Sequence, residues 1–265
     1  MYRMISKSII ALMFVVIVYL LRKVVNWVER GCLFQNVRCP SSVKVKGDDV
    51  QEVNIGKVNA LYYKNPVRDD RIVMYLHGNS GHIHQRYSIL NRFKPYASFI
   101  MFDYSGYGKT PGKPTELGVK KDAMKVWRWL IDSKGYTPDQ IVVYGNSLGS
   151  SIATWLVSVL DKEKPRQLVI QAGFCNYREI VGDLMHPLIS YLCTISFDTA
   201  SYLESIGDRV PVLIVHSPDD KLINIRHSKH LREKNPHAKF YQITGTHNNP
   251  GLDNKYFEYF CNECL

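Results

Sequence analysis

Apolar stretches alternate along the chain with segments of mixed polarity. Six of these stretches have the length and the β-branched or aromatic content of buried strands. They are Arg71–Leu76, Ser98–Tyr104, Ile141–Tyr144, Gln167–Ala172, Val210–His216 and Lys239–Thr244. Strands that alternate with helices predict a mostly parallel sheet with helices on both faces, which is an α/β fold.

The segments between these strands have the spacing of amphipathic helices. Helices are expected at Thr115–Lys134, Ser150–Leu160, Ile225–Asn235 and Asn254–Cys264, and an amphipathic segment of roughly 13 residues follows Gly81. Thr115 is expected to cap its helix and Gly135 to close it. Before the first parallel strand, Gln51–Ile55 and Lys57–Tyr63 predict a hairpin that turns at Gly56.

Residues 1–30 have a different pattern. Ser8–Leu21 is uncharged and almost wholly apolar, and Ile5–Val28 reaches the roughly 20 residues that a membrane span needs. Aromatic residues that suit a membrane interface are Tyr2, Tyr19 and Trp27, and the cationic residues near the ends of the run are Lys7, Arg22 and Lys23. A cleaved signal peptide and a buried helix are the alternatives. Because no small-residue cleavage site follows the run, residues 1–30 are predicted to be a non-cleaved membrane anchor.

Residues 31–265 are then expected to form one catalytic domain outside the membrane. The excess of Lys and Arg after the apolar run slightly favours a cytosolic domain. Cys32 and Cys39, just past the run, are palmitoylation candidates or free thiols. Residues 173–209 lack a strand pattern and are rich in large apolar residues, so they are expected to form a helical cap at the carboxyl edge of the sheet.

The composition excludes several classes of function. The net charge of +10 over 265 residues comes from scattered Lys and Arg without a nucleic-acid motif, so no nucleic-acid partner is expected, although anionic lipid would be attracted. The six cysteines are too spread for a disulfide framework, and Cys261 and Cys264 have no second pair to complete a zinc site. His82 and His84 also lack a third ligand. No metal or cofactor is therefore predicted.

The main chemical signal is Gly145-Asn146-Ser147-Leu148-Gly149, a G-x-S-x-G sequence between a predicted strand and a predicted helix. In that context the pattern predicts a sharp turn that presents the serine hydroxyl, a nucleophile elbow. A serine hydroxyl needs a general base to remove its proton and a carboxylate to orient that base. The backbone N–H of Leu148 would face the oxyanion that forms on the substrate.

On such a sheet the acid and then the base follow the serine in the chain. The strand ending at His216 leads into Asp219 and Asp220, and only one of these can face the base. Of nine histidines, only His247 lies in a loop after the last strand. Others on expected helices or caps are His82, His84, His186, His227, His230 and His237. The loop after Leu76 is expected to supply the second oxyanion donor, the backbone N–H of Asn79 or, as second choice, Ser80.

Six motifs between residue 45 and the end of the chain form a specific set. They are His77-Gly78-Asn79, Phe102–Lys109, Gly145–Gly149, Phe197-Asp198-Thr199, Pro211–Ile223 and Gly245-Thr246-His247-Asn248. As a set they resemble the α/β-hydrolase superfamily. More narrowly, they resemble its membrane-anchored "alpha/beta-hydrolase domain-containing" branch, which is related to fungal bud-emergence proteins and protein depalmitoylases. The resemblance implies an α/β-hydrolase fold with a short helical cap, and it places the acid at Asp220.

The resemblance also implies hydrolysis of esters or thioesters in lipid-like substrates. Two departures from the pattern affect the choice of substrate. Asn146 stands where Gln or His often precedes the serine, and a hydrophobic anchor replaces the N-terminal cysteine cluster of the depalmitoylases. The leading hypothesis is a membrane-anchored serine hydrolase that acts on membrane lipids or other acylated substrates. The alternatives are an oligopeptidase-like peptidase and a catalytically idle scaffold that binds a ligand.

Overall fold

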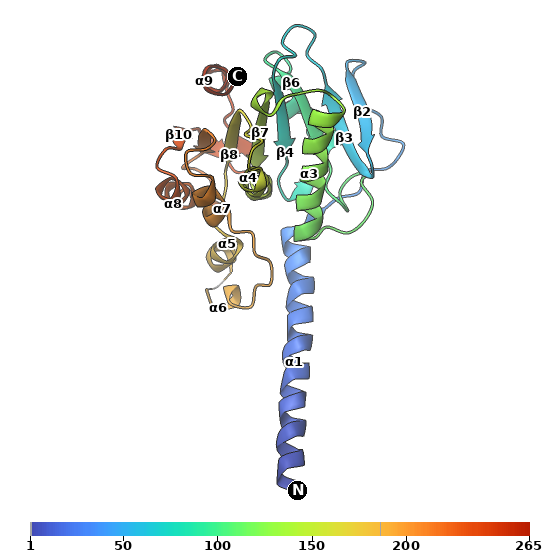
Figure 1. The fold of residues 1–265 in the computed structure, drawn as a ribbon, viewed down its shortest axis with the longest axis vertical. Helices are drawn as coiled ribbons and strands as arrows, with labels where there is room; N and C mark the ends of the chain where they lie inside the picture. Colours follow the sequence, from blue (N-terminus) through green and yellow to red (C-terminus); the bar gives the residue numbers. More distant parts are fainter. Residues whose placement is uncertain (1, 186) are drawn as a thin grey trace.

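The computed structural model describes residues 2–185 and 187–265, and all their side chains except those of residues 2–8, 188 and 189. A rounded α/β domain sits at one end of a long N-terminal helix that projects from it (Figure 1). His186, which was expected on a helix or cap, lies outside the described residues, as do the side chains of Tyr2 and Lys7.

An eight-stranded sheet organises the domain. Its strands, in spatial order, are β10 (Lys239–Gln242), β9 (Val212–His216), β8 (Gln167–Gln171), β7 (Ile141–Asn146), β4 (Ile72–Leu76), β6 (Ser98–Phe102), β3 (Val58–Tyr63) and β2 (Val50–Ile55). The six strands from β10 to β6 are parallel, and β3 and β2 are antiparallel to their neighbours. The predicted parallel strands and the hairpin at Gly56 are confirmed.

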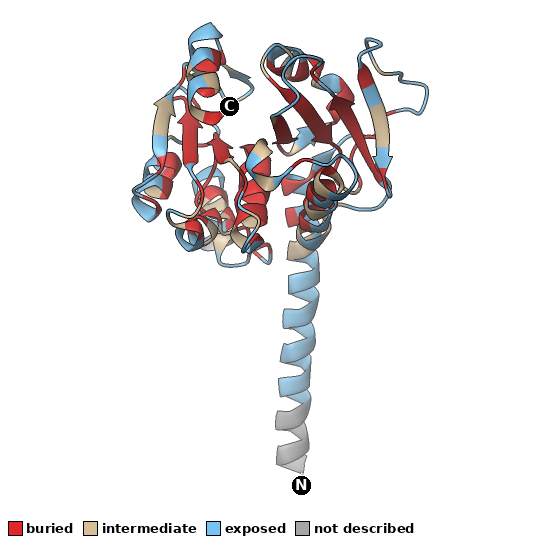
Figure 2. Cartoon of the chain, turned by 45° about the horizontal axis from the view of Figure 1, so that its top comes forward, coloured by how far each residue is buried: buried red, intermediate tan, exposed pale blue. Residues whose placement is uncertain are grey.

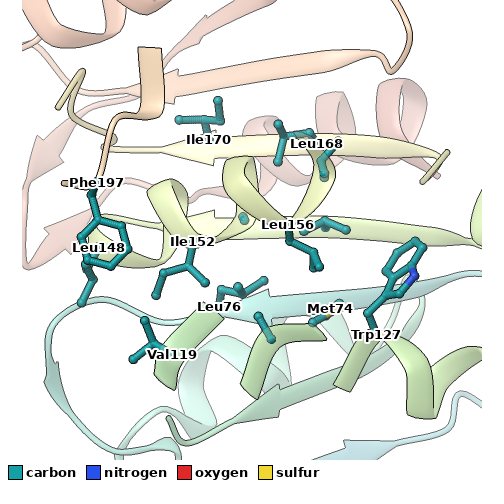
Figure 3. Close-up of a cluster of buried hydrophobic side chains, with 14 of the residues drawn as sticks. Met74, Leu76, Val119, Trp127, Leu148, Ile152, Leu156, Leu168, Ile170 and Phe197 are labelled. Atoms are coloured by element: carbon teal, nitrogen blue, oxygen red, sulfur yellow. The ribbon is translucent and has the colours of Figure 1, made fainter. Parts of the chain in front are cut away.

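Successive residues of each central strand belong to two separate cores. In β4, Ile72, Met74 and Leu76 face one core while Val73 and Tyr75 face the other. The first core is covered by α3 (Glu116–Asp132), α4 (Leu148–Val159), α7 (Thr199–Ile206) and α8 (Arg226–Lys234), and the second by α2 (Tyr87–Phe93) and α9 (Asn254–Cys264). Figure 2 shows buried residues concentrated on the sheet, and Figure 3 shows the side chains packed under α3 and α4.

The capping residues and breaks in the sequence pattern predicted most helix ends to within about two residues. The Thr115 side chain accepts a hydrogen bond from the Gly118 N–H at 3.0 Å, and Lys120 pairs with Glu116 at 2.7 Å. The amphipathic segment after Gly81 is shorter as a helix than expected. It divides into a 3₁₀ turn, Ile83–Gln85, and α2, because the Ile83 N–H donates to the Asp103 carboxylate at 3.0 Å and turns the chain.

The N-terminal helix α1 spans Tyr2–Leu33 and so runs past the predicted boundary at residue 30. Its residues Ile9–Leu33 are long and apolar enough to cross a membrane by length and composition. Leu33 and Phe34 are buried in the first core. The following strand β1 (Gln35–Asn36) pairs in parallel with β5 (Ser80–Gly81), which directly follows Asn79. The helix is thus joined to the domain without a linker.

Within 173–209, the residues that the structure describes form helices and no strand, as expected from their pattern. Two short helices, α5 (Tyr177–Leu184) and α6 (Pro187–Ser190), lie beyond the carboxyl edge of the sheet beside α1 (Figure 1). By contrast α7 packs against α4 and α8, and its Leu203 and Ile206 are in the first core. The structural cap is therefore narrower than the predicted segment and ends before α7.

Candidate active site

The turn between β7 and α4 is tight and holds Ser147 in an unusual conformation. Ser147 has φ 53° and ψ −118°, a region that L-residues rarely occupy and that costs about 1–3 kcal/mol. Both glycines of the pentapeptide are required by close backbone approach. A methyl group at Gly145 would overlap the Gly149 carbonyl oxygen, and one at Gly149 would overlap the Leu76 carbonyl oxygen. The turn therefore has the geometry of the predicted elbow.

His247 lies between the two-residue strands β11 (Gly245–Thr246) and β12 (Asn249–Pro250), which pair as a small hairpin. Its Nε2 lies 3.0 Å from Ser147 Oγ, and its Nδ1 lies 2.7 Å from Asp220 Oδ2. Since an ionised carboxylate only accepts hydrogen bonds, we assign the proton to Nδ1. Nε2 is then free to accept the hydroxyl proton of Ser147.

Asp220 is held from several sides. Its Oδ1 accepts hydrogen bonds from the backbone N–H groups of Leu222 and Ile223, each at 2.9 Å. Burial alone would raise the pKa of Asp220, but hydrogen bonds from His216, His247 and the Ile223 amide outweigh it and hold the pKa below its ordinary range. The neighbouring Asp219 is exposed. The structure therefore brings Asp220, and not Asp219, to His247.

His216 is a further partner of the acid that the sequence did not single out. The ring is fully buried, and its Nε2 lies 2.9 Å from the Ile223 carbonyl oxygen and 3.3 Å from Asp220 Oδ2. Ser228 Oγ lies 2.6 Å from the other ring nitrogen. With the proton on Nε2, the ring donates to both oxygens and ties the acid loop into one turn.

The loop after β4 passes directly beside Ser147. A methyl group at Gly78 would lie 3.3 Å from Ser147 Cβ, so glycine allows the approach. The hydroxyl of Tyr107 donates to the Asn79 carbonyl at 2.7 Å, and that of Tyr104 donates to the His77 carbonyl at 2.8 Å. Within the described part of the chain, the N–H groups of Asn79 and Leu148 have no hydrogen-bond partner.

Comparison with known proteins finds relatives over most of the chain. No family model matches the chain. It is 29% identical over 206 residues to the uncharacterized protein R595 of Acanthamoeba polyphaga mimivirus, covering 71% of this chain and 70% of that one. It is also 33% identical over 181 residues to the lysophosphatidylserine lipase ABHD12 of Xenopus tropicalis, covering 60% of this chain but only 45% of that relative.

Solved structures agree with these sequence relatives. The Pyrococcus furiosus esterase Pf2001 aligns with a TM-score of 0.65 and 18% identity over 86% of this chain and 95% of its own. An α/β hydrolase from Vibrio vulnificus aligns with a TM-score of 0.63 and 18% identity, over 78% and 80%. The chain therefore has the α/β-hydrolase fold, as the resemblance implied. Its sequence relatives include proteins named lysophosphatidylserine lipase ABHD12.

The candidate site opens into a cavity of about 860 Å³. Ser147, His247, Leu148 and Asn79 lie at one part of its wall, and most of the remaining wall is apolar. The cap contributes Phe174, Tyr177, Ile180, Val181, Leu184, Met185, Leu192 and Cys193, and α1 contributes Val24, Val25, Val28, Glu29, Cys32 and Leu33. A hydrocarbon chain is the kind of ligand that such a wall accommodates.

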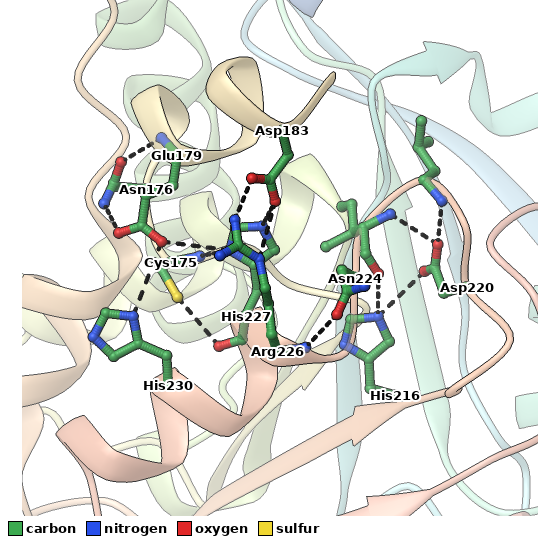
Figure 4. A network of polar contacts seen from close by, with 12 residues as sticks. Cys175, Asn176, Glu179, Asp183, His216, Asp220, Asn224, Arg226, His227 and His230 are labelled. Atoms are coloured by element: carbon green, nitrogen blue, oxygen red, sulfur yellow. Dashed lines mark hydrogen bonds and ion pairs between the residues drawn. The ribbon is translucent and has the colours of Figure 1, made fainter. Parts of the chain in front are cut away.

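A polar network ties the cap to the loop that carries Asp220 (Figure 4). Asp183 on α5 pairs with Arg226, and His227 Nε2 lies 3.1 Å from the same carboxylate. The hydrogen bond and charge of Arg226 lower the pKa of Asp183, so the pair is ionised at neutral pH. Because Arg226 begins the helix that follows the acid loop, movement of α5 and placement of Asp220 are structurally connected.

The same network contains one set of possible metal donors among the residues that the structure describes. Cys175, Glu179 and His230 place one donor atom each within 4.8 Å of one another. Burial raises the pKa of the Cys175 thiol to about 12, and Sγ donates to the His227 carbonyl oxygen at 3.2 Å. A thiol must lose its proton to bind a metal, so this arrangement disfavours coordination.

Beneath the loop that carries Asn79 lies a buried pair, His77 and Asp103. Burial lowers the pKa of His77 to about 3 and raises the pKa of Asp103 to about 7. His77 Nε2 lies 3.8 Å from Asp103 Oδ1, and His77 Nδ1 lies 2.7 Å from the Gly78 carbonyl oxygen. Both groups are therefore uncharged over the mildly acidic range, and they support the loop as neutral polar groups.

Proposed function

We propose that this chain is a membrane-anchored serine hydrolase that cleaves acyl ester or thioester bonds of lipid-like substrates. One observation carries the proposal. The contacts from Ser147 Oγ to His247 Nε2 at 3.0 Å, and from His247 Nδ1 to Asp220 Oδ2 at 2.7 Å, form a continuous series of hydrogen bonds. Only the first contact passes a proton in the proposed reaction, and the second orients His247; Ser147 and His247 lie at the wall of a largely apolar cavity.

In the proposed reaction Ser147 Oγ attacks the acyl carbonyl carbon while His247 Nε2 takes the hydroxyl proton. His247 then delivers this proton to the leaving alcohol or thiol, and the acyl group remains on Ser147. Water attacks the acyl-enzyme in the second half, with His247 as the base again. Asp220 keeps the proton of His247 on Nδ1 and stabilises the imidazolium that forms twice in each cycle.

Stabilisation of the oxyanion is assigned to the backbone N–H groups of Leu148 and Asn79. Leu148 follows Ser147 in the chain, Asn79 follows Gly78, which approaches Ser147 closely, and neither N–H has another partner in the described part of the molecule. Each such donor is worth about 3–4 kcal/mol of transition-state stabilisation in comparable sites. Ser80 is the weaker candidate because its backbone pairs with Gln35 in the small parallel ladder.

The membrane part of the proposal rests on α1. Its segment Ile9–Leu33 has 25 residues with a mean hydropathy of 2.2, and it is exposed over the window that would cross the bilayer. An exposed apolar helix of this length is stable in lipid and unfavourable in water. The relatives named as lysophosphatidylserine lipases support a lipid ester as the substrate class. The excess of cations after the span favours a cytosolic domain.

Labelling with a fluorophosphonate probe tests the proposal directly. We expect the full chain in detergent micelles to be labelled covalently and Ser147→Ala to remain unlabelled. Turnover of p-nitrophenyl acyl esters, compared with dipeptide amides, then separates an esterase from an oligopeptidase-like enzyme. If wild type is not labelled while its thermal unfolding is cooperative, the chain is an idle scaffold and the proposal is wrong.

A further inference from the structure

The membrane helix forms part of the cavity wall. The residues of α1 that line the cavity are Val24, Val25, Val28, Glu29, Cys32 and Leu33, which recur at helical spacing over the last three turns of the helix. They face cap residues such as Leu184 and Leu192 across the same space. A segment that would serve only as a tether has no reason to border the space around Ser147.

Polar contacts hold this wall to the cap. Glu29 is 6% exposed, and its carboxylate accepts hydrogen bonds from the backbone N–H and the hydroxyl of Thr194. The Asn26 amide donates to the same hydroxyl at 2.7 Å. Thr194 follows α6 in the cap. The helix and the cap are thus linked at Glu29, one helical turn after Val25, and both of these residues line the cavity.

An apolar line continues from the cavity along α1 toward the N-terminus. Residues at intervals of three or four lie on one face of a helix. Starting inside the cavity and moving toward the span, these residues are Cys32, Val28, Val24, Leu21, Ile17 and Phe14. The line contains no charged residue, and Val24 and Leu21 are exposed at the point where α1 leaves the domain. A hydrocarbon chain can therefore lie along α1 from the bilayer to the cavity.

The rim of the cavity beside this line is also apolar and exposed. Leu184, Met185 and Leu192 of the cap each expose more than half of their surface, at 53%, 59% and 59%. They border the cavity together with Val24. Exposed apolar side chains grouped around a cavity mouth favour contact with lipid over contact with water. The mouth thus lies where a helix emerging from a membrane would bring it to the bilayer surface.

We infer that α1 is the substrate-selecting wall of the enzyme, and that the acyl chain of a bilayer lipid enters sideways along the face of α1 that carries Val24 and Val28. This inference rests on the proposed hydrolase function and adds the route and the selecting residues. Val28 and Cys32 set the space for the acyl chain, while Ser147 and His247 act on its ester. The occupant is a hydrocarbon chain that is already in the membrane.

The test uses the full chain reconstituted in phosphatidylcholine vesicles. Wild type and Val28→Trp are compared on palmitoyl and butyryl esters of the same alcohol. The added indole would fill the space beside Val28, so the ratio of kcat/KM for the palmitoyl ester to that for the butyryl ester should fall about tenfold or more. Val16→Trp is the matched control. It lies on the opposite face of α1, outside the cavity wall, and should keep the wild-type ratio.

The outcomes separate the two proposals. If wild type is neither labelled by fluorophosphonate nor active on either ester, the hydrolase function fails. If wild type is active and Val28→Trp keeps the wild-type ratio, or if Val16→Trp lowers it equally, α1 is a tether only and the inference is overturned. Butyryl ester turnover by Val28→Trp shows that the variant is folded.

A chemical version of the test covers the case in which Val28→Trp does not fold. Cys32 is exposed and borders the cavity. A dodecyl methanethiosulfonate should attach an alkyl chain to Cys32 and block palmitoyl ester hydrolysis at least tenfold, and a reductant should restore it. Cys32→Ser should resist the reagent. Equal inhibition of wild type and Cys32→Ser would contradict the inference.

Discussion

The elbow around Ser147 and the wall formed by α1 and the cap border the same cavity but are built differently. At the elbow, backbone atoms of β7, α4 and β4 approach so closely that no side chain fits at Gly145 or Gly149. At the wall, α1 meets the segment after α6 through a few polar contacts around Thr194, and the apolar side chains of the cap rim are largely exposed. The elbow is held by close backbone packing, and the wall is held by a small number of polar contacts.

This difference separates the chemistry from the choice of substrate. A nucleophile, a base and an oxyanion loop must keep their distances within a few tenths of an ångström, so they are held by buried backbone. A wall that admits a lipid chain must open, and segments with few buried contacts open most readily. Substitutions at the elbow should therefore change kcat or stability strongly, and those at the wall should change selectivity weakly to moderately.

The largest effect is expected at the acid. Asp220→Asn should lower kcat by roughly 10⁴-fold without unfolding the protein, because the amide can still accept the Leu222 and Ile223 N–H groups but would present an N–H to His247. His247 would then carry its proton on the wrong nitrogen. The measurement is kcat on a short ester together with the thermal midpoint. A variant with kcat within tenfold of wild type would remove Asp220 from the proposed mechanism.

Next in size is a change at the elbow itself. Gly149→Ala should lower the free energy of unfolding by roughly 3 kcal/mol or abolish folding, because its methyl group overlaps the Leu76 carbonyl oxygen. Urea unfolding of the full chain in micelles measures this change. Gly31→Ala on α1 is the matched control. It has open space around it and should be neutral or stabilising by up to about 1 kcal/mol. A similar loss of unfolding free energy in Gly149→Ala and Gly31→Ala would contradict the proposed difference between the elbow and α1.

The buried pair below the oxyanion loop predicts pH effects of opposite sign. In Asp103→Asn only His77 remains. Its folded pKa of about 3 lies below its unfolded value, so stability should rise as the pH increases from about 3 to 6.5. In His77→Gln only Asp103 remains, and its raised folded pKa of about 7 should make stability fall as the pH increases from about 4 to 7.

In wild type these two contributions oppose each other between about pH 4 and 6.5, so its stability should change less there than in either variant. Each single slope is at most about 1.4 kcal/mol per pH unit. The free energy of unfolding in urea, measured at several pH values across this range, gives both slopes. Because other groups also titrate in this range, each slope is compared with that of wild type; if both variants changed the wild-type slope in the same direction, the pair would not be uncharged in the folded protein.

The smallest effect is expected at the contact between α1 and the cap. Glu29→Ala removes the acceptor of the Thr194 N–H, which should speed exchange of that amide and change the palmitoyl-to-butyryl ratio by only a few-fold. Hydrogen exchange and the ester ratio measure the two consequences. Arg30→Ala is the control on the outer face of α1. Unchanged exchange at Thr194 in Glu29→Ala would show that the cap is held elsewhere.

Much of the fold was predictable because its signals are local. The glycines around Ser147, the Thr115 cap and the turn at Gly56 each depend on residues within a few positions in the chain. The parallel strands followed from their length and apolar content. The order of serine, acid and histidine then restricted the partners of Ser147 to Asp219 or Asp220 and to His247, and the family pattern selected between the two aspartates.

Other features depend on contacts between distant segments, which the pattern does not encode. His216 looked like the end of a strand, yet its buried ring supports Asp220 from below. Residues 199–206 were predicted to be part of the cap because the segment is apolar. In the structure their apolar side chains pack against α4. The carboxyl-terminal turns of α1 had the composition of a membrane span, and only the fold shows that they border the cavity.

The two-residue ladder between β1 and β5 has a mechanical consequence. Gln35 pairs with Ser80, and Phe34 is already buried in the core, so no slack exists between the end of α1 and the loop that holds Asn79. A helix whose apolar length differs from the thickness of its bilayer tilts. If α1 spans the bilayer as proposed, a change in its tilt is transmitted to the domain through the short connection at Phe34–Gln35. A thicker or thinner membrane would then press directly on the loop that carries Asn79, the proposed oxyanion donor.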